Sequence, residues 1–137
     1  MTLDDSARPR SDRRLWVWLL YWLGIFIATH VPVVGGGHFH FRYFDKIVHF
    51  VLYFFLAYLG GGYLFVAGRA RSTLSLIGYA GMYAVYGAFD EWLQQYTGRT
   101  MSVDDWLADA GGIALATIWL VRKRRSSTAP DATGHVG

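Results

Sequence analysis

Long apolar stretches without charged side chains constrain this chain more than any other feature. The first runs from Leu15 to Val34, twenty residues without Asp, Glu, Lys or Arg, and about 20 apolar residues suffice for a helix to cross a bilayer. Further apolar segments cover about residues 47–67, 73–89 and 105–121. In lipid only helices and closed barrels satisfy their backbone groups, and these segments are too long for barrel strands. We therefore expect an all-α fold, a four-helix transmembrane bundle.

The distribution of basic residues predicts how the bundle is oriented. Ten Arg and Lys residues lie in the two terminal segments and the loop between the second and third apolar segments, against three on the opposite face. Basic residues are enriched on the cytoplasmic side of membrane proteins. We therefore expect both termini to be cytoplasmic. The first segment is too long for a signal peptide and lacks a small-x-small cleavage site, so we interpret it as a signal anchor.

Composition and charge divide the chain into three parts. We expect a cytoplasmic N-terminal tail at residues 1–14, a transmembrane domain at 15–121 and a basic, disordered cytoplasmic tail at 122–137. The basic residues cluster at the ends of apolar segments and not on a folded face, which disfavours nucleic-acid binding. The chain has no cysteine, which excludes metal or nucleophile chemistry based on that residue.

Small residues recur at every fourth position of the third and fourth segments. They are Ala80, Ala84 and Ala88 on one, and Ala108, Gly112 and Ala116 on the other. Such stripes let two membrane helices approach closely, so we expect these two helices to pack along them. Chance is the alternative, because Ala and Gly are common in membrane helices.

Polar side chains gather at the expected outward ends of the last three segments. Asp45 and His49 are four residues apart and share a helix face, with Tyr53 one turn deeper. On the next helix Asp90 and Gln94 share a face in the same way. Charged groups near the membrane core are costly and usually face the bundle interior. These groups are therefore expected to meet inside the bundle.

The fourth segment adds Asp105 and Asp109 on one face, and Glu91 lies about 100° around its helix from Asp90. Arg99 follows in the next loop, close enough to reach back over these acids. We expect one outward-facing polar pocket, lined by Asp45, His49, Tyr53, Asp90, Glu91, Gln94, Arg99, Asp105 and Asp109.

Simpler roles are open for several of these residues. Asp45 and either Asp104 or Asp105 could cap their helices, and Asp90 with Glu91 could form a hydrated helix end. We interpret His30 as a polar residue that packs between helices. His38 and His40 form an H-x-H pair in a loop, which alone is weak support for a metal site. We predict no metal and no cofactor.

The order of these motifs resembles the VanZ-like family of bacterial membrane proteins. Asp45-Lys46-x-x-His49-x-x-x-Tyr53 is similar to that family's D-K-x-x-H-x-x-x-Y signature. A second block of the family reads D-E-x-x-Q, followed in order by G-R, a single D and a single G. The matching residues here are Asp90, Glu91, Gln94, Gly98, Arg99, Asp105 and Gly112. The resemblance covers residues 29–116. Asp109 is a departure, because family members often have Asn there.

The resemblance implies a multi-pass protein of the bacterial inner (cytoplasmic) membrane, and the family takes its name from an accessory protein associated with teicoplanin resistance. Two functions fit the residues. In the first, the pocket binds an amphiphilic or lipid-linked envelope molecule among membrane lipids. In the second, the protein is an enzyme in which Asp90 or Glu91 is the general acid–base, Asp45 orients His49, and Arg99 clamps an anion. The oligomeric state is not predicted.

Overall fold

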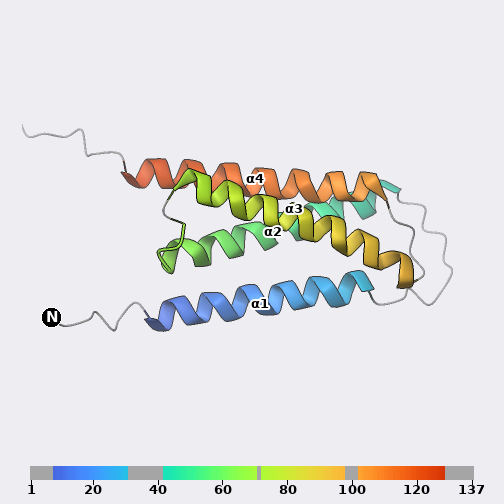
Figure 1. Cartoon of the computed structure of the whole chain (residues 1–137), viewed down its shortest axis with the longest axis horizontal. Coiled ribbons are helices and arrows are strands. Elements are labelled where there is room, and N and C mark those ends of the chain that lie inside the picture. The colour runs from blue at the N-terminus through green and yellow to red at the C-terminus, as the bar shows by residue number, and fades with distance from the viewer. Residues whose placement is uncertain (1–7, 31–41, 71, 98–101, 129–137) are drawn as a thin grey trace, which may run out of the picture.

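Four α-helices make up most of this computed structural model, which describes residues 8–30, 42–70, 72–97 and 102–128. The elements are α1 (Arg8–His30), α2 (Arg42–Val66), α3 (Thr73–Gln94), the short 3₁₀ helix η1 (Gln95–Thr97) and α4 (Val103–Thr128). No strand occurs among the residues described (Figure 1). The expected all-α, four-helix fold is therefore confirmed.

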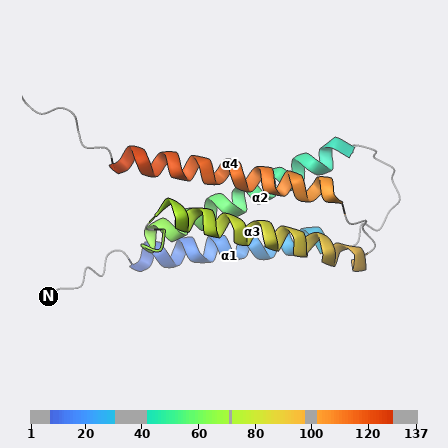
Figure 2. The same cartoon turned by 45° about the horizontal axis from the view of Figure 1, so that its top comes forward.

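The helices lie side by side with alternating directions along the chain (Figures 1 and 2). The start of α1, the connection from α2 to α3 and the end of α4 lie at one end of the bundle, which we call the terminal end. The end of α1, the start of α2, the end of α3 and the start of α4 lie at the other, which we call the loop end. The polar residues singled out in the sequence belong to the loop end.

The closest helix packing joins α2 to α4, and Gly112 makes it possible. A Cβ atom on Gly112 would overlap the backbone carbonyl of Phe50 and come within 2.9 Å of the Phe54 nitrogen. Gly112 therefore lies against α2 and not against α3, where we expected it. The expected packing of α3 with α4 is also present. Contact between α3 and α4 includes Trp106, whose indole N–H donates to the Ala84 carbonyl at 3.0 Å.

An aromatic core fills the middle of the bundle. The ring of Trp22 on α1 lies edge-on to Tyr83 and Tyr86 of α3, with centroids 5.8 and 5.0 Å away. Tyr53 and Leu56 of α2 are fully buried beside them. The hydroxyl of Tyr21 also ties α1 to α2 by donating to a backbone carbonyl at 3.1 Å. This core separates the loop end from the terminal end.

The helix ends differ from the sequence-based boundaries. Ser72 and Ser75 form a capping box at the start of α3. At the start of α4 the Ser102 hydroxyl accepts the Asp105 N–H at 3.3 Å, so a serine provides the cap that we considered for Asp104 or Asp105. α1 begins before residue 15 and α4 continues through the basic residues to Thr128. Disorder was therefore the wrong expectation for residues 122–128.

One helical stretch among the described residues, Phe44–Val66 of α2, is long and apolar enough by itself to cross a membrane. The other helices carry more polar sequence. α3 includes three tyrosines, three glycines and the Asp90–Glu91 pair, and α4 has two aspartates in its first turn and basic residues near its end. Length and apolar character thus single out α2 alone.

A glycine comparison tests the α2–α4 packing. We expect Gly112→Ala to lower the free energy of unfolding by about 1–3 kcal/mol, because the new methyl group meets backbone atoms that cannot move aside. Gly78 has open space around its Cβ position, so Gly78→Ala should leave stability unchanged or raise it by up to about 1 kcal/mol. Thermal unfolding in detergent measures both. Equal stability of the two variants would contradict this packing.

Candidate functional site

Three helices each bring one ionisable side chain into a buried group at the loop end. His49 of α2, Glu91 of α3 and Asp109 of α4 are only 3%, 2% and 1% exposed. The His49 Nδ1 atom lies 3.0 Å from Asp109 Oδ1 and 3.7 Å from Glu91 Oε1. We call these residues the histidine–carboxylate cluster. Its members are far apart in the sequence and meet only through the packing of the bundle.

Glycine and a helix cap position the two carboxylates of the cluster. A Cβ atom on Gly87 would lie 3.4 Å from Asp109 Oδ2 and 3.2 Å from the Tyr53 ring, so this glycine lets α3 approach both groups. The backbone N–H of Ser102 donates to Glu91 Oε2 at 3.1 Å. The other oxygen of each carboxylate is buried and has no hydrogen-bond partner among the described residues. Two acceptor atoms are thus open to a ligand, a proton or water.

Asp90 anchors a second polar group beside the cluster. Gln94 donates to its Oδ2 atom at 3.1 Å, and the hydroxyls of Thr29 and Tyr86 each lie 3.4 Å from its Oδ1 atom. His30 Nδ1 is 3.7 Å from the same oxygen. Asp90 is 1% exposed, so these contacts replace its hydration. Because Thr29 and His30 belong to α1, all four helices contribute to the site.

Lys46 lies at the outer edge of the site. Its ammonium group donates to Asp105 Oδ1 at 3.0 Å and lies 3.3 Å from Asp104 Oδ2. This strong base therefore pairs with the two outer aspartates and not with the buried cluster. The charge of the deeper carboxylates is met mainly by histidines, whose own charge depends on protonation.

The structure brings together most of the pocket residues expected from the sequence. The buried ones that meet are His49, Asp90, Glu91, Gln94 and Asp109, with the buried ring of Tyr53 directly beneath them. Asp105 lies at the rim with Lys46. Asp45 is exposed, but one of its carboxylate oxygens lies within 4.8 Å of a His49 ring nitrogen and of an Asp105 oxygen. The carboxylate that lies 3.0 Å from His49 Nδ1 is that of Asp109, so an orienting role for Asp45 stays a prediction. Arg99 lies outside the described residues, as do His38 and His40.

Sequence reasoning missed several members of the site. Thr29 and His30 reach Asp90 from α1, although His30 had been read as a packing residue. Ser102 holds Glu91 through its backbone, which no side-chain pattern shows. Tyr86, one turn before Asp90 on α3, also contacts Asp90 and was not among the expected pocket residues. A threonine–histidine pair near the end of an apolar segment is the signal that could have pointed to α1.

The cluster has two chemical capabilities. A carboxylate that accepts a hydrogen bond from the Nδ1–H group of a histidine leaves the Nε2 atom free to act as a base, and the 3.0 Å contact of His49 Nδ1 with Asp109 allows that arrangement. In addition, one potential ligand atom each from His49, Glu91 and Asp109 lie within 4.8 Å of one another. Nitrogen and carboxylate oxygens suit divalent cations such as zinc or manganese. The expectation of no metal remains a prediction.

No family model, curated protein or solved structure matches this chain. The VanZ-like resemblance therefore depends on the motifs and their order alone.

Two neighbouring glutamines provide a test of the Asp90 group. Gln94→Leu removes the amide donor of buried Asp90, and an unsatisfied buried acceptor costs about 1–3 kcal/mol. Gln95 is exposed and its side-chain amide donates to the backbone carbonyl of Trp92, so Gln95→Leu should change the free energy of unfolding by no more than about 0.5 kcal/mol. Thermal unfolding in detergent compares them. A larger loss for Gln95→Leu than for Gln94→Leu would refute the assigned role.

Proposed function

We propose that this chain is a VanZ-like integral membrane protein of the bacterial envelope that binds an amphiphilic or lipid-linked envelope molecule at the loop end. In this proposal all four helices span the inner membrane, both termini are cytoplasmic and the loop end faces outward. A link to glycopeptide (teicoplanin) resistance is part of the family resemblance.

Apolar side chains on the outer surface of every helix support the membrane location. Leu20, Ile47, Val85 and Trp119, one from each helix, are 63%, 58%, 71% and 59% exposed. Apolar surface of this extent is unusual on a soluble monomer, whereas lipid would cover it at no cost. The α-helices have 22 to 26 residues, and at 1.5 Å per residue they measure about 33–39 Å, enough to cross a bilayer core.

Burial of His49, Asp90, Glu91 and Asp109 together is the observation that carries the binding function. Desolvating a charge is costly, and a buried ionic group is often no more stable than apolar residues of similar volume. In membrane helices such groups usually mark a site of function. Among the residues that the structure describes, three carboxylates face two histidines here. The acid excess favours a ligand whose head group is cationic or rich in hydrogen-bond donors, while its apolar part lies in the surrounding lipid.

A membrane-embedded enzyme is the second candidate, favoured by the 3.0 Å contact between His49 and Asp109. Asp109 would orient the imidazole, which would act as general base toward a lipid-linked substrate, and Glu91 would be the general acid. The sequence-based hypothesis instead made Asp90 or Glu91 the general acid–base and gave the orienting role to Asp45.

Topology is the first test of this proposal. Reporter domains fused after residues 37 and 98 should both be translocated across the inner membrane, because both positions belong to connections at the loop end. A reporter fused after residue 128 should stay in the cytoplasm. Activity of alkaline phosphatase fusions, which requires export, measures each position. A cytoplasmic result at residue 37 or residue 98 would reject the proposed orientation.

Ligand binding is the second test. The protein in nanodiscs is incubated with lipid-linked cell-wall precursors and with teicoplanin, and bound and converted ligand are both quantified. We expect binding to the wild type, loss of binding with alanine at His49, Asp90 or Arg99, and wild-type binding for Asp104→Asn, whose carboxylate is mainly exposed.

The outcomes separate the candidates. Binding without conversion supports the binding protein, and conversion that depends on His49 supports the enzyme. Binding that survives His49→Ala would place the ligand elsewhere and contradict both. Membrane insertion of each variant, checked by flotation with vesicles, excludes misfolding as the cause of a loss.

A further inference from the structure

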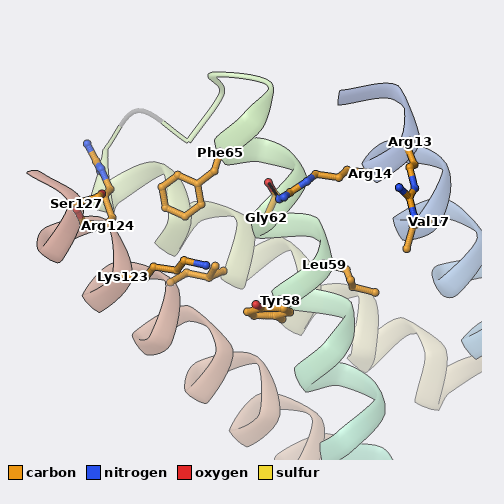
Figure 3. A pocket seen from close by; sticks show the side chains of 11 residues that line it. Arg13, Arg14, Val17, Tyr58, Leu59, Gly62, Phe65, Lys123, Arg124 and Ser127 are labelled. Carbon is orange, nitrogen blue, oxygen red and sulfur yellow. Dashed lines mark hydrogen bonds between the residues drawn. The ribbon is translucent and has the colours of Figure 1, made fainter. Parts of the chain in front are cut away.

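A second site lies at the terminal end, far along the bundle from the histidine–carboxylate cluster. A cavity of about 740 Å³ opens there between α1 and α4, with α2 as its floor (Figure 3). Four basic side chains line it, Arg13 and Arg14 from α1 and Lys123 and Arg124 from α4. We call it the basic groove. Its volume lies within the range of small-molecule sites.

Polarity changes with depth along the groove. The basic residues lie toward the helix ends, and Val17, Leu59 and Leu120 lie one to two turns deeper toward the middle of the bundle. Lys123 and Leu120, for example, are three residues apart on α4, which corresponds to about 4.5 Å along the helix axis. The groove thus offers a cationic mouth and an apolar interior, the complement of a molecule with an anionic head and a hydrocarbon tail.

Three of the four basic side chains of the groove lack an acidic partner in the described part of the chain. No ion pair joins Arg13, Arg14 or Lys123 to a carboxylate among the described residues. Arg14 instead extends from α1 across to α2 and donates to the Gly62 carbonyl at 3.4 Å (Figure 3). Like charges gathered from two helices repel one another, so an anion between them would stabilise the arrangement.

We propose that the basic groove binds an anionic phospholipid of the leaflet at the terminal end. Its phosphate lies among Arg13, Arg14 and Lys123, and one acyl chain runs inward past Val17 and Leu59. The inference goes beyond the function of the loop end but rests on the proposed membrane location, because a lipid enters the groove from its own leaflet. A soluble phosphate compound would use the basic mouth and leave the apolar interior empty.

The experiment compares two double variants that lose the same charge. Arg13→Gln/Lys123→Gln alters the groove, whereas Arg122→Gln/Arg125→Gln alters the same basic end outside it. Full-length protein in neutral detergent is titrated with fluorescent phosphatidylglycerol, followed by anisotropy. Unlabelled phosphatidylglycerol, phosphatidylcholine with the same chains, and glycerol phosphate serve as competitors. Flotation of all three proteins with vesicles is measured in parallel.

We expect phosphatidylglycerol to compete best and affinity to fall about fivefold for each charge removed from the groove, with a smaller change in the control variant. Equal losses in the two variants would overturn the proposal, because the attraction would then belong to the whole basic end. Competition by phosphatidylcholine or glycerol phosphate as strong as that by phosphatidylglycerol would overturn it too. Failure of the wild type to float with vesicles would instead reject the membrane location itself.

Discussion

The close approach of α4 to the backbone of α2 at Gly112 is the constraint on which the loop-end site depends. Gly112 lies against Phe50, the residue after His49, and Asp109 precedes Gly112 by almost one turn on the same side of α4. The glycine contact therefore sets the distance at which Asp109 meets His49. Gly87 acts in the same way on α3, because it lies one turn before Glu91 and leaves room for Tyr53 and Asp109. Two positions without side chains thus hold three ionisable groups together.

Acidic and basic side chains are concentrated at opposite ends of the bundle. Carboxylates gather at the loop end and basic residues at the terminal end, and the aromatic core of Trp22, Tyr53 and Tyr83 lies between them. Apolar side chains cover the outer surface, while the buried ionisable groups face inward. Water-soluble proteins usually have the opposite distribution, with charged side chains outside and apolar side chains inside. Apolar side chains outside and charged side chains inside are typical of proteins in lipid. In our proposal each end uses its charge at a different membrane surface.

Helical periodicity predicted much of this, and its failures have a common cause. Spacings of four residues correctly identified the faces that carry His49, Asp90, Gln94 and Asp109, all of which are buried in the bundle. Periodicity does not say which helix a face meets, so Gly112 was expected to face α3 and lies against α2 instead. Contacts through the backbone, such as Ser102 with Glu91, leave no pattern in the side chains. The helical basic segment after residue 121 was missed because polar composition was taken as disorder.

The central claim is that the histidine–carboxylate cluster is kept for function and not for stability. The most direct measurement is the unfolding temperature of the isosteric variant Glu91→Gln/Asp109→Asn, recorded together with its ligand binding. If the buried charges serve a ligand, neutral side chains of the same shape should unfold at an equal or higher temperature and should bind no ligand. A clearly lower unfolding temperature, with binding retained by the protein that stays folded, would show that the cluster holds the helices together and would contradict the claim.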